Sequence, residues 1–326
     1  MISKNSIKAS LKSLPHPLLA VMRFFVVRPI RAYTRYAPWS KGKLLLYRSI
    51  AEHLWWLEGT VTSSTVFGKT LKVDAGDIIG KHIYYFGIWE PNLTHWIECR
   101  LQRGDLFIDV GASIGYYSLL ASKLVGDSGK VVAIEPLPET FGRLEDNLKK
   151  NEVRNVRTIN AAAWDKTEKV KIFASQKSLS GTTTLMSEWA NQWHLKKQLE
   201  VDAAPLSVIL KPDEIKTARL IKIDVEGAEL HVVSDMVSWL SQTIDKFEIV
   251  IELSRSILEA EGKQVGDVLR LFARFGFRGY RIENDYLAST CVANNFRPPR
   301  RIYQWPNESV DQIDVIFSRV DAEYLY

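Results

Sequence analysis

An apolar run, a glycine turn, an expected helix and a second apolar run follow one another between residues 105 and 136. This order constrains the fold more than any other feature of the chain. Leu106–Val110 is a short, bounded run of the kind that forms a buried parallel strand. The run breaks at Gly111, Gly115 opens the next helix, and the second run ends at Glu135. Together these features predict a βαβ unit whose glycine turn holds a nucleotide-like ligand.

The spacing within the turn distinguishes between kinds of ligand. A dinucleotide fingerprint requires G-x-G-x-x-G, whereas this turn has D-x-G-x-x-x-G, with Ser113 where an additional glycine often falls. Asp109 places a carboxylate at the end of the strand, which would repel a pyrophosphate but suits a ligand that carries an ammonium and a sulfonium group. S-adenosyl-L-methionine is such a ligand, and the two oxygens of Glu135 could accept hydrogen bonds from both of its ribose hydroxyls.

We therefore expect Asp109, Gly111, Ser113, Gly115 and Glu135 to bind this cofactor. The alternative is an ordinary turn of a parallel sheet, in which the acidic residues only cap helices. The agreement of turn, helix and second acidic residue favours the cofactor site.

Length and composition bound the remaining possibilities. A chain of 326 residues can form one large or two small domains with a substantial core. The two cysteines, Cys99 and Cys291, lie far apart and have no companions at metal-ligand spacing, which argues against a disulfide framework and a zinc site. A reducing, cytoplasmic compartment is therefore expected. The net charge of +5 is modest and does not by itself indicate a nucleic-acid partner.

The basic residues are concentrated at the N-terminus. The first acidic residue is Glu52, so every charged side chain between Lys4 and Arg48 is basic. The apolar stretch Leu18–Ile30 is too short and too interrupted by arginines to span a bilayer. Residues 1–45 fit either an interfacial helix at the inner membrane surface or a cap that packs its apolar side on the main domain and leaves its basic side in water. The sequence leaves both interpretations open.

Periodicity divides the chain into a basic helical segment (1–59), a hairpin and helix leading into the core (60–103), and a cofactor-binding domain (104–326). In the last part strands alternate with helices, which is typical of a doubly wound sheet. The expected strands are Leu106–Val110, Val131–Glu135, Val156–Ala161, Leu220–Asp224, Phe247–Leu253, Arg278–Ile282 and Ile313–Ser318, with Val170–Phe173 as a short addition. The expected helices are Leu44–Leu57, Glu90–Leu101, Tyr116–Leu124, Glu139–Asn151, Gly227–Trp239 and Val265–Phe275, and a hairpin is expected over Thr60–Val73. Asn284–Asp311 is expected to be a loop.

Five segments carry a pattern that resembles a known family. They are Tyr85–Pro91, Asp109–Tyr117, Ala133–Pro136, Ala163–Asp165 and Ile221–Glu229, of which the last, Ile-Lys-Ile-Asp-Val-Glu-Gly-Ala-Glu, is the most specific. Over roughly residues 60–285 the chain is similar to the FkbM-type methyltransferases, a branch of the Rossmann-like enzymes that use S-adenosyl-L-methionine. Ser113 departs from many relatives, which carry Asn or Gly there, but a short polar side chain should be tolerated.

The resemblance implies an α/β fold of the class I methyltransferases, with a Rossmann-like, doubly wound sheet of seven strands including one antiparallel edge strand. A small N-terminal α+β extension would precede it. The resemblance also implies methyl transfer to a hydroxyl oxygen, often that of a sugar, a glycan or a natural product. Ala162 and Trp164 lie where such enzymes commonly sandwich the adenine ring, and Asp165 could accept from its exocyclic amine. The alternative for Trp164 is a place in the core or a helix lid.

The acceptor side of the site should lie at the end of the fourth expected strand, where open α/β sheets hold their reacting groups. Asp224 and Glu226 are the candidate catalytic residues, and one of them would orient or deprotonate the acceptor hydroxyl. Alternatively, Glu226 and Glu229 only cap the following helix. Asp224 and Glu226, together with Glu252, could also hold magnesium, but nothing fixes their geometry and no metal is assigned.

Two further readings stay open. The hydroxyl-rich segment Ser180–Thr184 is a candidate substrate or cofactor loop. The whole protein could instead be a non-catalytic module that binds a nucleoside cofactor and attaches to a membrane or an assembly through its basic N-terminus. A nucleic-acid acceptor is disfavoured, because no reader motif accompanies the N-terminal basic excess. We expect a small-molecule or glycan acceptor and make no prediction of the oligomeric state.

Overall fold

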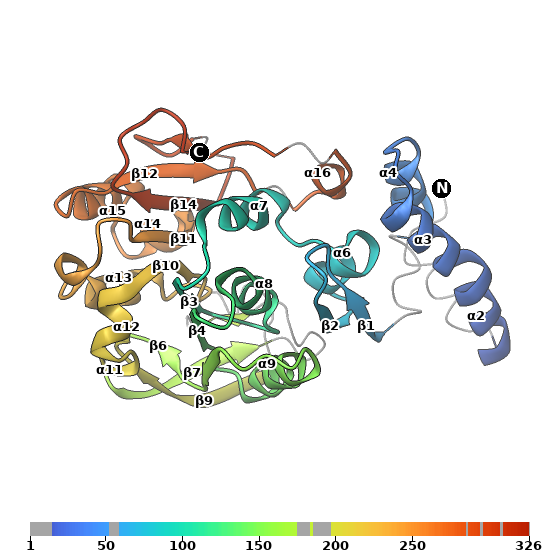
Figure 1. Ribbon diagram of the computed structural model, residues 1–326, viewed down its shortest axis with the longest axis horizontal. Coiled ribbons are helices and arrows are strands. Elements are labelled where there is room, and N and C mark those ends of the chain that lie inside the picture. The colour runs from blue at the N-terminus through green and yellow to red at the C-terminus, as the bar shows by residue number, and fades with distance from the viewer. Residues whose placement is uncertain are drawn as a thin grey trace. The chain divides into compact units, whose positions relative to one another are not determined.

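The computed structural model describes residues 15–51, 59–174, 183–184, 197–284, 286–293, 296–306 and 309–325. It divides into two compact units (Figure 1). The small unit comprises Met1–Trp89 and Tyr286–Asn295, and the core unit comprises Glu90–Asp285 and Phe296–Tyr326. The segment from Glu90 to the first core strand therefore belongs with the core unit, although the sequence grouped it with the preceding hairpin.

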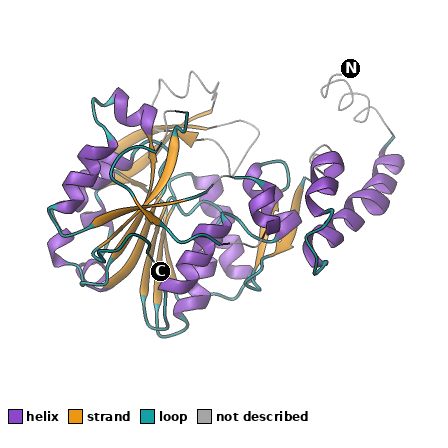
Figure 2. Ribbon diagram, turned by 90° about the horizontal axis from the view of Figure 1, so that it is seen from above, coloured by secondary structure: helices purple, strands orange, loops and turns teal. Residues whose placement is uncertain are grey.

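An eight-stranded sheet forms the centre of the core unit, with helices on both of its faces (Figure 2). The strand order is β13-β12-β14-β11-β10-β3-β4-β5. The strands are β3 (Leu106–Val110), β4 (Lys130–Ile134), β5 (Val156–Ile159), β10 (Ala218–Ile223), β11 (Glu248–Ser254), β12 (Arg278–Ile282), β13 (Arg300–Arg301) and β14 (Gln312–Ser318). All seven strands expected for the main sheet are present in it, which confirms the Rossmann-like, doubly wound class.

The position of the antiparallel strand differs from the expectation. Strand β14 pairs antiparallel with both β11 and β12, so it lies inside the sheet and not at its edge. The edge is formed by the two-residue strand β13, which pairs with β12. The remaining contacts, from β11 through β10, β3 and β4 to β5, are parallel.

The central strands are apolar because helices cover them on both faces. Every residue of β3 and of β10 is buried, and Ile108, Ile221 and Ile251 are completely inaccessible to solvent. Burying one such side chain contributes about 1.5–3 kcal/mol relative to leaving it exposed. This explains why continuous apolar runs, without alternation, identified these strands in the sequence.

The helices of the core unit are close to those expected. They are α7 (Pro91–Arg100), α8 (Tyr116–Val125), α9 (Pro138–Lys150), α11 (Leu206–Ile209), α12 (Pro212–Thr217), α13 (Glu229–Met236), α14 (Arg255–Ala260) and α15 (Val265–Ala273). Helix α13 is shorter than the expected Gly227–Trp239, and the short helices α11, α12 and α14 were not expected.

A second sheet accompanies the main one. Its order is β6-β9-β7-β8, formed by Ala162–Ala163, Lys197–Ala204, Glu168–Ala174 and Thr183–Thr184. Strand β7 extends the short strand expected at Val170–Phe173, and β9 was not expected, although Leu199, Val201 and Ala203 alternate with polar residues. The candidate loop Ser180–Thr184 lies outside the described residues, apart from the two residues of β8.

The small unit combines short helices with one hairpin. Its elements are α2 (His16–Met22), the π-helical turn η1 (Arg23–Val27), α3 (Arg28–Tyr36), α4 (Lys43–Leu46), the π-helical turn η2 (Tyr47–Ala51), β1 (Thr60–Ser64), β2 (Thr70–Asp74), α6 (Ile78–Phe86) and α16 (Ala288–Ala293). The antiparallel pairing of β1 with β2 confirms the expected hairpin. Helix α16 shows that part of the stretch Asn284–Asp311, expected to be a loop, is helical.

Side chains form hydrogen bonds with the backbone at both ends of helix α6, and two of them are arginines. Asp77 accepts a hydrogen bond from the Gly80 amide at its start. At its end, Arg31 of α3 donates to the Tyr84 carbonyl over 3.1 Å and Arg35 donates to the Ile83 carbonyl over 3.0 Å. Cations are favoured at the C-terminus of a helix. These two arginines are therefore bound within the small unit, whereas the cap interpretation left the basic side of this segment in water.

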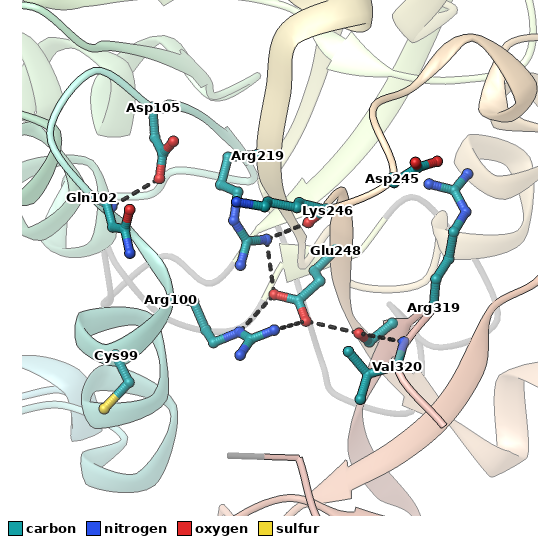
Figure 3. A pocket seen from close by; sticks show the side chains of 11 residues that line it. Cys99, Arg100, Gln102, Asp105, Arg219, Asp245, Lys246, Glu248, Arg319 and Val320 are labelled. Atoms are coloured by element: carbon teal, nitrogen blue, oxygen red, sulfur yellow. Dashed lines mark hydrogen bonds and ion pairs between the residues drawn. The ribbon is translucent and has the colours of Figure 1, made fainter. Parts of the chain in front are cut away.

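A pocket of about 480 Å³ lies at the edge of the main sheet where β10 and β11 begin (Figure 3). At its floor the buried carboxylate of Glu248, 2% exposed, forms ion pairs with Arg100 and Arg219. It also accepts a hydrogen bond of 2.8 Å from the Ser318 hydroxyl. This network joins α7, β10, β11 and β14 at the edge opposite to the carboxyl ends of the parallel strands.

We predict that Glu248→Ala lowers the free energy of unfolding by about 3–5 kcal/mol, because it leaves two arginines without their buried counter-charge. Urea unfolding of the purified chain measures the effect. Glu259→Ala is the matched control, because Glu259 forms only an exposed pair with Arg255 on α14 and its loss should cost less than about 1 kcal/mol. Equal unfolding midpoints for the two variants would contradict a stabilising role of this network.

Candidate functional site

The glycine turn packs directly against the end of β10. Gly111 has φ +80°, and a Cβ built there would overlap the backbone carbonyl oxygen of Asp224. The Asp224 amide in turn donates to the Val110 carbonyl over 3.0 Å. The sequence singled out Gly111, and the structure shows that the backbone of Asp224 occupies the space that a side chain there would need. The close contact brings Asp224 next to the turn.

The rest of the glycine turn is hydrogen-bonded to the residue that follows β4. Ser113 adopts a left-handed φ of 49° and donates its amide to Glu135 Oε2 over 2.9 Å. Gly115, with φ +90°, precedes α8, and a Cβ there would meet Leu144 Cδ1 at 2.7 Å. The five residues predicted to bind the cofactor therefore lie together at the carboxyl ends of β3 and β4.

Glu135 follows β4 and is buried. Its carboxylate accepts hydrogen bonds from the Ser113 and Leu137 amides, over 2.9 and 3.0 Å. Burial raises the pKa of Glu135 to about 7, although these two amides act in the opposite direction. Each carboxylate oxygen has a further lone pair, so the residue can still accept from ribose hydroxyls.

Asp109 has an oxygen with no protein partner. It is 1% exposed, its Oδ2 accepts from the Ser118 hydroxyl over 2.6 Å, and its Oδ1 has no hydrogen-bond partner among the described residues. Burial raises the pKa of this carboxyl. An unsatisfied buried oxygen is costly and calls for a donor. The ammonium group of S-adenosyl-L-methionine is such a donor, so the residues of this turn fit the cofactor that the sequence indicated.

Two of the three residues predicted to contact adenine meet at His231 of α13. The indole of Trp164 stacks on the His231 ring with centroids 3.7 Å apart, and Asp165 Oδ2 lies 3.1 Å from His231 Nδ1. Ala162 is buried in β6. No ring fits between Trp164 and His231 at this separation, so an adenine contact would use the other face of the indole. The roles of these three residues stay predictions.

Asp224 directly follows β10, where the sequence predicted the acceptor side of the site. Its carboxylate, 31% exposed, forms an ion pair of 2.8 Å with the buried ammonium of Lys222. Burial alone would lower the pKa of Lys222, but the surrounding carboxylates, Asp224 first among them, outweigh burial and raise it. Lys222 therefore stays charged, and its ion pair holds the Asp224 carboxylate beside the glycine turn.

The two glutamates that follow Asp224, Glu226 and Glu229, differ in their surroundings. Glu229 accepts from the Gly227 amide over 3.1 Å and from the Val225 amide over 3.3 Å, so it binds the loop that leads into α13. Glu226 has a left-handed φ of 52°, and burial raises its pKa well above the usual range, with Asp224 acting in the same direction. Glu226 therefore stays available as a candidate for the acceptor.

Two further carboxyl groups interact electrostatically with Lys222 and were not predicted from the sequence. Glu90 precedes α7 and accepts a hydrogen bond from the Tyr117 hydroxyl, and Asp314 of β14 accepts from Asn284 over 2.7 Å. Burial raises the pKa of Glu90 to about 8 and that of Asp314 to about 6. An acidic residue within the apolar run of β14 was a visible signal for Asp314, and Glu90 stood in one of the segments that carry the family resemblance.

Within the described part of the chain, no group of three or more His, Cys, Asp or Glu side chains is arranged to hold a metal ion. The acidic cluster instead surrounds the single ammonium of Lys222.

Fold and site together define an α/β protein of the class I methyltransferase type. The family model for the methyltransferase FkbM domain matches residues 109–279, just over half of the 326 residues. The chain belongs to this family, and its cofactor is S-adenosyl-L-methionine. The class of fold, the family and the cofactor predicted from the sequence are thereby confirmed.

Curated relatives are similar over short stretches. A protein-L-isoaspartate O-methyltransferase of Methanococcus maripaludis is 37% identical over 62 residues, which are 19% of this chain and 29% of that protein. A probable cobalt-precorrin-6B C(15)-methyltransferase (decarboxylating) of Sulfolobus acidocaldarius is 33% identical over 88 residues, 27% of this chain and 46% of that protein. The matches thus span less than half the length of either relative.

Solved structures show distant similarity. Methyltransferase FkbM from Methylobacillus flagellatus has a TM-score of 0.39 and 16% identity, covering 91% of this chain and 60% of that one. Aeropyrum pernix fibrillarin with natively bound S-adenosyl-L-methionine has a TM-score of 0.36 and 12% identity, covering 67% and 68%.

Gly111→Ala should abolish close contact between the turn and β10, because the new methyl group would overlap the Asp224 carbonyl in a strained backbone conformation. We expect the affinity for S-adenosyl-L-methionine, measured by calorimetry, to fall by more than about tenfold, equivalent to about 1.4 kcal/mol. Gly142→Ala on α9 is the control, because a Cβ there meets nothing within 4 Å. An unchanged affinity in the Gly111 variant would show that the contact does not shape the cofactor site.

Proposed function

We propose that this protein transfers the methyl group of S-adenosyl-L-methionine to a hydroxyl oxygen of a small-molecule or glycan acceptor. The proposal rests on one observation, the group of carboxyls that surrounds Lys222 at the carboxyl end of β10 and the amino end of β14, beside the glycine turn. The donor already carries a good leaving group, so the protein needs only to align an acceptor and to accept its proton. Carboxylates serve both purposes for a hydroxyl.

Asp224 is our first candidate for contact with the acceptor. It is partly exposed, and its carboxylate is oriented by the buried ammonium of Lys222. Glu226 is the alternative, because it lies two residues further along the same loop. Either carboxylate can accept the hydrogen bond of a hydroxyl and direct its lone pair towards the methyl group.

The charge of the site favours an uncharged acceptor. Lys222 faces Asp224, Glu90 and Asp109, so the cluster is acidic even when some of these groups hold a proton. A polyanion such as nucleic acid would be repelled by such a cluster. The protein and precorrin substrates named for the curated relatives belong to those proteins, whose matches span 19% and 27% of this chain.

The test begins with calorimetry and continues with a radiolabelled-methyl assay against neutral oligosaccharides and extracted cellular glycans. We expect saturable cofactor binding and methyl transfer that falls about 100-fold or more in Asp224→Asn, with cofactor affinity unchanged. Asp202→Asn, at an exposed position of β9, is the matched control. Undiminished transfer in both Asp224→Asn and Glu226→Gln would refute these catalytic assignments. Cofactor binding without transfer to any acceptor would favour the non-catalytic module.

A second proposal concerns the small unit, which we infer contacts an anionic membrane surface. Phe24 and Phe25 of η1 are 55% and 68% exposed, and Leu18 and Val21 of α2 are exposed as well. The surrounding segment carries no acidic residue before Glu52. Exposed apolar and aromatic side chains within a basic segment are typical of interfacial helices. Among the helices that the structure describes, none is both long enough and apolar enough to cross a bilayer.

The double variant Phe24→Ser/Phe25→Ser should bind vesicles of phosphatidylcholine and phosphatidylglycerol at least about tenfold more weakly than the wild type, because it loses apolar area that lipid would bury. Co-sedimentation measures the difference. Val208→Ser is the control, because Val208 is a 64% exposed apolar residue of the core unit. Equal partitioning of all three proteins would refute the membrane contact.

A further inference from the structure

Glu90 occupies an unusual backbone conformation that nothing in the cofactor site explains. It has φ 41° and ψ 72°, in the left-handed region, and is followed by Pro91 at the first turn of α7. Residues other than glycine are uncommon in this region, and such strain persists where the surroundings impose it. Glu90 does not cap α7 through its side chain, and it is 7% exposed. Its carboxyl therefore has another task.

The contacts of Glu90 lead to the acceptor side. Its carboxyl accepts a hydrogen bond from the hydroxyl of Tyr117, which belongs to the first turn of α8, directly after the glycine turn. The Lys222 ammonium lies 5.0 Å from the centroid of the Tyr117 ring, and it pairs with Asp224. A continuous set of polar and aromatic groups thus joins the segment before α7 to the proposed acceptor carboxylate.

The charges that face Glu90 come from several elements. Burial raises the pKa of its carboxyl to about 8, and Asp314 of β14 and Asp224 act in the same direction. Lys222 of β10 and the Tyr117 hydroxyl of α8 act in the opposite direction. At neutral pH the carboxyl therefore holds a proton when no ligand is bound. A cation that enters the site favours the ionised form and displaces that proton.

We propose that Glu90 is the proton-holding residue of the acceptor subsite, which loses its proton when the cationic methyl donor binds and takes one from the acceptor hydroxyl during transfer. The proposal rests on the hydroxyl-directed methyl transfer argued above and assigns two separate roles within it. Asp224 orients the hydroxyl, and Glu90 receives the proton. In the step itself an O–C bond forms, the O–H bond breaks with its proton passing to the carboxylate, and the C–S bond breaks with its electron pair going to sulfur.

Calorimetry with two ligands tests the first half without an acceptor. S-adenosylhomocysteine lacks the methyl group and the sulfonium charge of S-adenosyl-L-methionine, so the difference in protons released reports groups that respond to that charge. Titrations at pH 7 in buffers of different ionisation enthalpy should show that the wild type releases more protons with the charged ligand, and that Glu90→Gln abolishes most of the difference. The exposed control Glu259→Gln should keep it.

The wild-type affinity for the charged ligand should also rise between pH 6 and 8, because the bound state holds fewer protons on Glu90. The same proton release in Glu90→Gln as in the wild type would overturn the proposal. Failure of the wild type to bind either ligand would overturn the proposed function instead, so the two results are distinguishable.

A second variant keeps the test available if Glu90→Gln does not fold. Tyr117→Phe retains the ring beside Lys222 but removes the hydroxyl whose hydrogen bond lowers the pKa of Glu90. The pH dependence of proton release should therefore move to higher pH, and an unmoved profile would overturn the proposal. With an acceptor in hand, Glu90→Gln should lower kcat about 100-fold, and Glu90→Asp should restore part of it. Unchanged kcat and an unchanged pH profile in Glu90→Gln would refute the proton-accepting step.

Discussion

The close approach of β10 to the glycine turn is the constraint on which the site depends. Because Gly111 has no side chain, the Asp224 carbonyl fits against the turn, and the ends of β3 and β10 meet. The residues predicted to bind the donor, Asp109, Ser113 and Glu135, and the proposed acceptor carboxylate of Asp224 thereby become neighbours, although they lie far apart in the sequence. A methyl transfer enzyme needs this adjacency, since it works mainly by alignment.

Charge is the second constraint, and it gives the site its preference for cations. Buried carboxyls outnumber the one buried ammonium of Lys222, and burial raises the pKa of Glu90, Glu135 and Asp314 to about 8, 7 and 6. Such groups are destabilised in the ionised form while the site lacks a ligand. A donor with a sulfonium and an ammonium group supplies positive charge beside these carboxyls. The buried carboxyls that destabilise the free protein when ionised therefore favour binding of this donor.

Much of this could be predicted from the sequence, because the decisive signals are local. The bounds of β3 and β12 matched the expected strands, and the acidic residues at strand ends lie where the pattern placed them. The misses concern relations between distant residues. The interior position of β14 depends on which strands it pairs with, and no local pattern encodes that choice. The network from Glu90 through Tyr117 to Lys222 likewise exists only after α7, α8 and β10 have come together.

A crystal structure with S-adenosylhomocysteine bound tests the central claim most directly. The account predicts that the ligand's amino nitrogen lies within hydrogen-bonding distance of Asp109 Oδ1, the oxygen that has no partner among the described residues, and that its ribose hydroxyls contact Glu135. A ligand bound elsewhere, or an Asp109 Oδ1 satisfied by a protein group in the complex, would contradict it.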